Sequence, residues 1–488
     1  MIDGVQSGKG EEEGVSYLDL RPAVLFDEIT DYPAGYRVLV GMHSAAQRIA
    51  LSMGLERKAT RMELLPLLRE KLKDLTVIPP VVVQDGPITE NVFDGADVDI
   101  LKFPTPMWHE LDGGRYLGTG SATITRDLEE GWVNLGTYRV MIHDSKTIAC
   151  YICPGRHSHI HRQKFVERGE PCPIAISFGH DPLLFAAASG DVPYGVSEYE
   201  WAGGIKGRAI PVIIGEHTGL PIPAHSEIAI EGEVVFSETR PEGPFAEWTG
   251  YYGSMQRQEP IIKVKRLMHR NDPIITGVAR NRPPNESSFS FAFFRSARIW
   301  DYLEVAGVPD VRGVWCHETA GVSPFIVVSI KQRYPGHARQ ALGAVSSCRD
   351  GAHAGRYVIV VDEDIDPSNL ADVIWAMSSR SDPAEDIDFL RNCWSSALDP
   401  MIPSEEKDYC VNSRALIDAC RPYKWKDRFP PVAECSPQLR QEVIPEVESP
   451  GAGVKRDSGT WSGGLAPPHP APCTHTRSPA PRASSPCS

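Results

Sequence analysis

The chain has 488 residues, of which 41% are hydrophobic and 23% are charged, and its formal net charge at pH 7 is −14. This composition is ordinary for a globular protein, and the length exceeds a single hydrophobic core, so about two to four domains are expected. The acidic balance argues against nucleic-acid binding, which requires clustered Lys and Arg. Because the sequence has neither a run of 18 apolar residues nor a secretory signal, we expect no membrane segment and a cytoplasmic protein.

The eleven cysteines are scattered, and their odd number favours reduced thiols over a disulfide framework. Cys150 and Cys153 form the one close pair. Because no second pair follows at zinc-finger spacing, metal or redox chemistry at this pair is a disfavoured alternative.

The first folded stretch, residues 19–105, is predicted to be an α/β domain that follows a flexible arm, residues 1–18. Two helices are expected between residues 36 and 75, because apolar residues recur there at helical spacing. Those of the first helix are Ala46, Ile49, Ala50 and Met53, and those of the second are Met62, Leu64, Leu65 and Leu68.

The middle of the chain, residues 106–310, is predicted to be a β-barrel or sandwich. Short β-rich runs dominate the sequence from about residue 77, and Pro, Gly and Asp turn clusters separate them. The clearest runs are residues 76–83, 121–127, 137–144 and 173–179.

Residues 311–446 are predicted to form a second α/β domain. Apolar strands at 325–331 and 357–365 alternate with helical stretches at 337–348 and 367–379, which is the pattern of a βαβ unit. The tail, residues 447–488, is rich in Pro, Ser, Gly and Ala and is predicted to be disordered. It is either an ordinary flexible tail or a frameshifted or spliced end.

Four short stretches could carry chemistry. The first, residues 134–139 (NLGTYR), read alone is a loop followed by a surface or salt-bridged arginine. The fourth, around residues 240–253, has Glu242 and Glu247 on either side of a Gly-Pro turn. These carboxylates could converge on one cleft, where repulsion or burial would make one a proton donor. The alternative is a solvated acidic loop.

The second and third stretches contain candidate metal ligands. His157, His159 and His161 alternate, so a strand would align them on one side and a helix would separate them. Glu198 is either part of a helix N-terminus capped by Ser197 or an oxygen ligand. An Asn oxygen, a His nitrogen and a Glu carboxylate together suit manganese or magnesium rather than a closed zinc site.

Taken together, these four stretches resemble the central motifs of the UbiD-like decarboxylases in order and approximate spacing. Further matches lie at residues 279–287, 329–340, 361–376 and 378–383, so the resemblance covers roughly residues 20–430. Members of this family use prenylated flavin mononucleotide (FMN) to remove, or sometimes add, a carboxylate on an aromatic or α,β-unsaturated acid. The resemblance implies an α/β multidomain fold whose central domain is a split β-barrel like that of flavin reductases.

The resemblance also implies the site residues. Asn134, His157 and Glu198 correspond to the ligands of a divalent metal, Mn²⁺ or Mg²⁺, which anchors the flavin phosphate with K⁺ nearby; His159 is a possible substitute for His157. Arg139, Glu242 and Glu247 correspond to a catalytic Glu-Arg-Glu network. The implied cofactor-binding residues are Asn134, Leu135, Gly136, Thr137, Tyr138, Arg139, Arg156, His157, Glu198 and Lys331.

Chemistry explains why a cofactor is expected. Loss of carbon dioxide from an sp² carbon leaves a charge that no side chain can delocalise, so an electron sink is required. In the implied mechanism Arg139 orients the substrate carboxylate, Glu242 fixes Arg139, and Glu247 donates the replacing proton.

The implied partners are a small aromatic or unsaturated acid, a flavin prenyltransferase that supplies the cofactor, and further copies of the chain in a dimer or larger homo-oligomer. Two alternatives remain open: an ordinary flavin-binding reductase, and a catalytically disabled assembly subunit. The phenylalanines at 289, 291, 293 and 294 would suit an aromatic substrate, although Phe is more often a core residue.

Overall fold

The computed structural model describes residues 22–56, 60–190, 192–407 and 409–434. The predicted N-terminal arm, the predicted tail and residues 435–446 lie outside these ranges. The described residues up to Phe429 belong to one compact unit, and the few that follow belong to a second. None of the described helices has the length and apolar character needed to cross a membrane.

The two predicted N-terminal helices are confirmed as α2 (Ala46–Met53) and α3 (Arg61–Leu72). Their predicted apolar residues are buried, except Met62, which is half-buried against the same core. Thr60 is the N-cap residue of α3. Its hydroxyl accepts a hydrogen bond from the backbone N–H of Glu63, and the Glu63 carboxylate accepts one from the backbone N–H of Thr60. This reciprocal capping satisfies N–H groups that have no partner inside the helix.

The N-terminal strands do not form a sheet of their own. β1 (Val24–Phe26) pairs with β2 (Arg37–Val40), and β2 pairs in parallel with β17 (Ile274–Gly277), which is more than 230 residues away in the chain. β3 (Val81–Val82) pairs with β11 (Pro211–Ile214), which also pairs with β12 (Pro221–Pro223). The predicted boundary at residue 105 stays a prediction, because strands on both sides of it share sheets.

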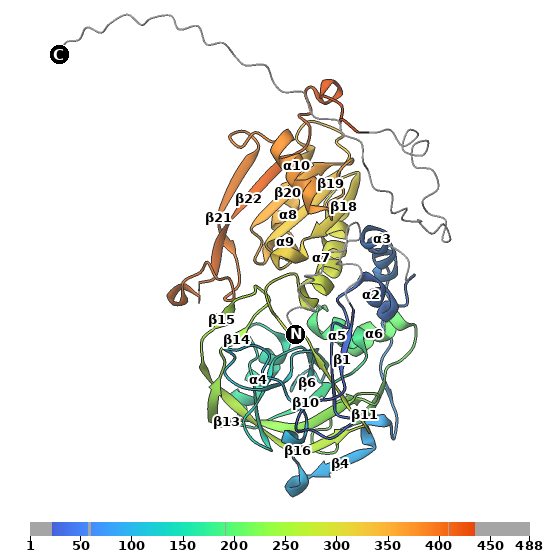
Figure 1. Ribbon diagram of the computed structural model, residues 1–488, viewed down its shortest axis with the longest axis vertical. Helices are drawn as coiled ribbons and strands as arrows, with labels where there is room; N and C mark the ends of the chain where they lie inside the picture. Colours follow the sequence, from blue (N-terminus) through green and yellow to red (C-terminus); the bar gives the residue numbers. More distant parts are fainter. Residues whose placement is uncertain (1–21, 57–59, 191, 408, 435–488) are drawn as a thin grey trace, which may run out of the picture. The chain divides into compact units, whose positions relative to one another are not determined.

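The middle of the chain forms a nine-stranded sheet in which every pair is antiparallel (Figure 1). Its order is β5 (Tyr116–Gly118), β8 (Val140–Ile142), β9 (Thr147–Cys150), β16 (Arg257–His269), β13 (Ile228–Glu242), β10 (Cys172–Phe178), β6 (Ala122–Arg126) and β7 (Val133–Gly136), with β4 (Asn91–Asp94) also on β16. The predicted β-rich middle is thus confirmed. Closure into a split barrel stays a prediction, since the strand order is open between β5 and β7.

Helices and short elements lie between the strands of this sheet along the chain. The helices are α4 (His157–Arg168), α5 (Pro182–Ser189) and α6 (Glu198–Lys206), and a hairpin joins β14 (Phe245–Ala246) to β15 (Tyr252–Ser254). The 3₁₀ turns before this sheet's later strands are η2 (Pro87–Thr89), η3 (Gly95–Asp97) and η4 (Ile100–Lys102), and those of the C-terminal part are η5 (Glu318–Ala320), η6 (Ser404–Glu406) and η7 (Lys426–Arg428).

The C-terminal part is a five-stranded mixed sheet in the order β18 (Val311–Cys316), β19 (Phe325–Ile330), β20 (Tyr357–Asp362), β22 (Val411–Ala419) and β21 (Ile387–Trp394). Its helices are α8 (His337–Ser347), α9 (Arg349–Ala352) and α10 (Leu370–Arg380). Side chains alternate along β20: Val358 and Val360 belong to the core that contains α8, whereas Ile359 and Val361 belong to the core that contains α10. The predicted βαβ pattern is therefore confirmed.

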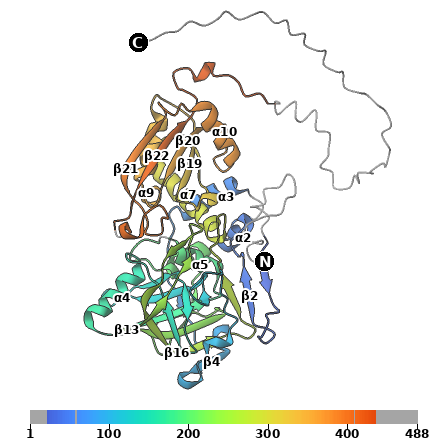
Figure 2. The same cartoon turned by 60° about the vertical axis from the view of Figure 1, so that its left-hand side comes forward.

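Helix α7 (Glu286–Val305) lies between the central sheet and the C-terminal sheet in both views (Figures 1 and 2). Phe289 and Phe293 are buried on it, and the Phe293 ring packs edge-on against Trp315 at 5.1 Å between ring centroids. Phe294 is also buried, and Phe291 packs against the same core. These phenylalanines are core residues.

Candidate active site

The central feature is a buried ion network around Arg139, in the loop between β7 and β8. Its Nε and Nη2 donate to the two oxygens of Glu242 at 2.6 and 2.7 Å, and its Nη1 donates to Glu247 Oε1 at 2.5 Å. The three residues are only 7%, 0% and 4% exposed. The structure thus brings together the three predicted catalytic residues, in a planar fork that a lysine could not reproduce.

The local backbone explains how the two glutamates meet one arginine. Glu242 ends β13, and Glu247 follows β14, where its N–H donates to the carbonyl of Tyr251 at 2.9 Å and closes a turn. Gly243 between them has a φ of 80°, a left-handed conformation that glycine adopts without steric cost. This turn reverses the chain so that both carboxylates face Arg139.

Three further side chains complete the network. The Tyr116 hydroxyl donates to Glu242 Oε1 at 3.1 Å, and the rings of Tyr151 and Phe245 lie 5.0 and 5.3 Å from the guanidinium carbon of Arg139. Although burial opposes its charge, hydrogen bonding to Glu242 and the charges of Glu247 and Glu242 raise the pKa of Arg139. The arginine is therefore a permanent cation in a low-dielectric pocket.

Arg280 also contacts the network. It lies in the loop between β17 and α7, and its Nη1 donates to Glu247 Oε2 at 3.0 Å. Sequence reasoning did not single out Arg280 or Tyr116. Arg280 falls within the matched stretch 279–287, but no local pattern connects it with a glutamate 33 residues earlier in the chain.

A second cluster gathers the predicted metal ligands. Asn134 on β7 has its Oδ1 3.2 Å from His157 Nδ1, and its Nδ2 donates to Ser158 Oγ at 2.8 Å. The next residue, Leu135, donates its backbone N–H to Glu198 Oε2 at 2.6 Å. Asn134, His157 and Glu198 therefore converge, although they come from β7, α4 and α6.

The histidine segment forms a helix, so the three histidines are separated rather than aligned as on a strand. His157 is the first residue of α4 and faces Asn134. His159 instead lies 3.3 Å from the Gln163 amide, and His161 packs against Thr125 and the buried Asp127. Of the two alternatives left open by the sequence, the structure brings His157 next to Asn134.

Glu198 lies at the start of a helix, as one of the two interpretations of its segment predicted. It begins α6, Ser197 is the N-cap residue, and the Glu200 carboxylate accepts a hydrogen bond from the Ser197 N–H at 3.4 Å, so the helix-start interpretation is confirmed. The Glu198 carboxyl itself is buried, and burial raises its pKa to about 8. Within the described ranges no basic side chain forms an ion pair with it, so this carboxyl is one that could bind a cation.

Three other predicted cofactor-binding residues, Thr137, Tyr138 and Arg156, are close in sequence to members of these clusters. The Thr137 N–H donates to the carbonyl of Ala188 at 3.1 Å. The Tyr138 ring lies against Gly136, where an added Cβ would come within 2.5 Å of it, and burial raises the pKa of Tyr138 to about 12. Arg156 is the exposed N-cap residue of α4.

Lys331 is not brought to either cluster. It follows the end of β19, where its ammonium pairs with Glu363 at 3.5 Å. The opposite end of the strand adjoins Gly321, which lies against Trp248 of the central segment. At about 3.3 Å per residue, β19 separates Lys331 from that end by about 20 Å.

Other groups noted in the sequence have structural partners. Arg380, within the matched stretch 378–383, is buried and paired with Asp362 and Asp364. The cysteines in the described part of the chain, Cys150 and Cys153 included, are free thiols. No group of three or more His, Cys, Asp or Glu residues that could hold a metal occurs among the described residues; the Asn134 cluster contains only two such residues.

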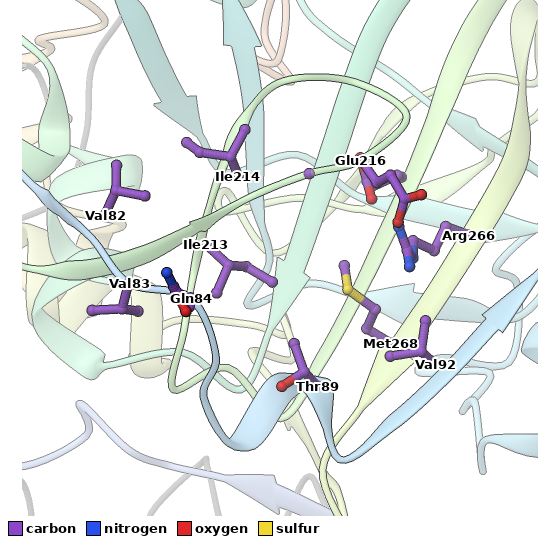
Figure 3. A pocket seen from close by; sticks show the side chains of 12 residues that line it. Val82, Val83, Gln84, Thr89, Val92, Ile213, Ile214, Glu216, Arg266 and Met268 are labelled. Atoms are coloured by element: carbon purple, nitrogen blue, oxygen red, sulfur yellow. The ribbon is translucent and has the colours of Figure 1, made fainter.

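Two cavities lie elsewhere on the central segment. One, of about 290 Å³, is bordered by Val83 and Ile213 on one side and by Glu216 and Arg266 on the other (Figure 3). The other, of about 370 Å³, is next to Asp127. Neither cavity is lined by a predicted site residue. The candidate active site is therefore defined by the Arg139 network and the Asn134 cluster.

The chain is similar to known proteins over most of its length. Residues 81–283 match the family model described as the 3-octaprenyl-4-hydroxybenzoate carboxy-lyase Rift-related domain, and residues 288–419 match the C-terminal domain of the same enzymes. The pyrrole-2-carboxylic acid decarboxylase of Pseudomonas aeruginosa is 31% identical over 82% of this chain and 83% of its own.

Solved structures are similar as well. The vanillic acid decarboxylase of Sedimentibacter hydroxybenzoicus in its open form is 29% identical, with a TM-score of 0.76 over 87% of this chain and 89% of its own. The UbiD-class enzyme HmfF of Pelotomaculum thermopropionicum, in complex with FMN, is 25% identical with a TM-score of 0.76 over 86% and 89% of the two chains. The chain therefore belongs to the UbiD family and is a UbiD-class carboxy-lyase.

Proposed function

We propose that this enzyme is a prenylated-FMN-dependent, reversible decarboxylase of an aromatic carboxylic acid. The observation that carries the proposal is the buried Glu242–Arg139–Glu247 network. A guanidinium fixed on one side by a glutamate is suited to orienting a carboxylate, and a second glutamate at its edge is suited to proton transfer. The alternative of an ordinary flavin reductase has no use for such a network, because hydride transfer involves no carboxylate.

In the proposed mechanism, Arg139 orients the substrate carboxylate, and Glu242 keeps the guanidinium in position through two parallel hydrogen bonds. Glu247 delivers the proton that replaces the lost carbon dioxide. The reverse reaction would use the same groups, so concentrations rather than the site set the direction.

The bound prenylated flavin would supply the electron sink that no side chain offers. The residues suited to holding its phosphate and metal are Asn134, His157 and Glu198. They offer an amide oxygen, an imidazole nitrogen and a buried carboxylate without a basic partner among the described residues, a donor set appropriate to Mn²⁺ or Mg²⁺. We leave Lys331 out of this set because its ammonium pairs with Glu363 at the far end of β19.

The proposed substrate class is inferred from the names of similar enzymes. Those at about 30% identity include enzymes named for pyrrole-2-carboxylic and phenolic acids, and we extend that class, an aromatic acid, to this chain. Supply of the cofactor by a flavin prenyltransferase and assembly into a homo-oligomer stay predictions.

The test of the function is reconstitution. The protein is co-expressed with a flavin prenyltransferase, its visible spectrum and metal content are recorded, and carbon dioxide release is measured from pyrrole-2-carboxylate, vanillate and 3,4-dihydroxybenzoate. We expect bound modified flavin and release from at least one acid. Bound ordinary flavin without release would favour a reductase, and a protein without cofactor would favour a disabled subunit.

The metal site gives a separate expected result. Glu198→Gln removes the one carboxylate of the donor set and should weaken Mn²⁺ binding by more than roughly 100-fold, beyond the effect typical of losing an outer-shell partner. His157→Ala should also lower the metal content, whereas His159→Ala should not. Elemental analysis of the dialysed proteins measures the metal content of each variant.

Glu200→Gln is the matched control, because it lies on the same helix turn and an amide can still accept the Ser197 N–H. Equal metal content in the Glu198 and Glu200 variants would contradict the assignment.

A further inference from the structure

Arg280 gives Glu247 a second guanidinium partner. Glu247 Oε1 accepts a hydrogen bond from Arg139 at 2.5 Å, and Oε2 accepts one from Arg280 at 3.0 Å. Both carboxyl oxygens therefore face N–H donors. A protonated carboxyl would direct its own O–H at one of these donors, so the arrangement is that of an ionised carboxylate.

The four groups balance in charge. Arg139 and Arg280 contribute two positive charges, and Glu242 and Glu247 contribute two negative charges, in a site where the Arg139 and glutamate side chains are at most 6% exposed. The surrounding ionisable groups are Tyr116, the pair His109–Asp112, Glu259 with Arg162 and Arg257, and the partly exposed Lys407. Glu259 has Arg162 and Arg257 as basic neighbours, and Asp112 accepts hydrogen bonds from the backbone N–H groups of His109 and Ala246. These carboxylates therefore have partners outside the central four groups.

A substrate carboxylate on Arg139 adds one negative charge to this balanced site. An uncompensated buried charge is strongly unfavourable, and the uptake of one proton from solvent restores neutrality. Glu242 cannot readily accept it, because both its oxygens are held by Arg139 and one also by Tyr116. Glu247 Oε2 can accept the proton, because its partner Arg280 lies on a loop with its side chain 21% exposed and can move away.

We propose that Arg280 is a positioning residue that keeps Glu247 ionised in the ligand-free enzyme, so that the acid takes up its proton together with the substrate. Arg280 then leaves Glu247 Oε2 and its charge offsets that of the bound carboxylate. The proton balance closes, since conversion of a carboxylate to carbon dioxide and a C–H bond consumes one proton. This inference rests on the proposed function, which assigns the proton donor.

Removal of Arg280 has a definite consequence for the ligand-free protein. With Arg139 alone, the site holds one positive and two potential negative charges, so neutrality requires one protonated carboxyl. Arg280→Gln should therefore carry a protonated Glu247 before any ligand binds. Arg280→Lys keeps the charge and should keep Glu247 ionised. Arg282→Gln, an exposed arginine two residues along the same loop, is the matched control and should behave as the wild type.

Infrared difference spectroscopy tests this without turnover. In each background, the spectrum of the ligand-free, FMN-loaded protein is compared with that of its Glu247→Gln partner at neutral pH. We expect a carboxylate band for the wild type, Arg280→Lys and Arg282→Gln, and a carboxylic acid band for Arg280→Gln. A carboxylic acid band in the wild type, or a carboxylate band in Arg280→Gln, would overturn the proposal.

Proton counting with a ligand is the second measurement. Pyrrole-2-carboxylate is titrated into the FMN-loaded protein by calorimetry in buffers of different ionisation enthalpy, with neutral pyrrole as the control. We expect the wild type to take up one proton per bound carboxylate and Arg280→Gln to take up none. Over the pH range in which one proton is taken up, the Kd of the wild type should rise about tenfold per pH unit. Binding without proton uptake in the wild type would refute the coupling. Absence of binding by any aromatic acid would instead count against the proposed function, and the infrared result would still decide the charge argument.

Discussion

Replacing Glu247 with Gln is expected to lower kcat for decarboxylation by about 10²- to 10⁴-fold, the range typical of losing a general acid. The amide has the same shape and can still accept the hydrogen bond from Arg139, so the network and the cofactor site should persist. The amide cannot donate the proton that replaces the lost carbon dioxide, because only a carboxylic acid can do so and leave a stable carboxylate. Carbon dioxide release by the reconstituted variant, together with its flavin spectrum, measures both parts of this expectation.

Glu238→Gln provides the comparison. Glu238 lies on the same strand as Glu242, but its side chain is 43% exposed and pairs with Lys263 at the surface. Its replacement should leave kcat within about twofold of the wild type, because exposed ion pairs contribute little. If Glu247→Gln kept activity close to that of Glu238→Gln, another group would have to be the proton donor.

Replacing Arg139 with Ala is expected to abolish decarboxylation and to lower the free energy of unfolding by about 3–5 kcal/mol, the usual cost of removing one partner from a buried ion pair. Glu242 and Glu247 would then be left in the interior without the guanidinium that balances them. Urea unfolding followed by tryptophan fluorescence gives the stability, and carbon dioxide release gives the activity.

Two further variants separate the loss of activity from the loss of stability. Arg139→Ala combined with Glu242→Gln removes one of the stranded charges, so it should recover part of the stability while remaining inactive. Arg139→Lys retains the charge but not the two parallel hydrogen bonds, and should be more stable than Arg139→Ala yet poorly active. An Arg139→Ala protein as stable as the wild type would show that water solvates the network, against the burial described above.

Local sequence patterns predicted the regular elements well. The apolar spacing from Ala46 to Met53 is the buried face of α2, and the runs 325–331 and 357–365 became β19 and β20. These signals depend on neighbours within a few residues, and burial of one face is their physical cause. The same patterns could not reveal that β2 pairs with β17 or β4 with β16, because strand pairing across more than 150 residues leaves no local signal.

The candidate site depends on four stretches that are separate in the sequence. No stretch alone identified it, and the local reading of His157, His159 and His161 left strand and helix open. The joint resemblance of four stretches singled out Arg139, Glu242 and Glu247, which the structure brings within hydrogen-bond distance. The roles assigned to them stay predictions that the variants above test.

The sequence by itself determined the family, the two N-terminal helices, the alternating strands and helices between residues 325 and 380, and a short set of candidate residues, since each depends on residue types at short spacing. Only the tertiary structure decided which histidine adjoins Asn134, that Lys331 lies away from both clusters, and that Tyr116 and Arg280 hold the two glutamates. The Tyr116–Glu242 hydrogen bond joins residues 126 positions apart. Contacts of this kind exist because sheet pairing brings distant strands together, and their geometry is set by the packed fold rather than by any segment of the chain.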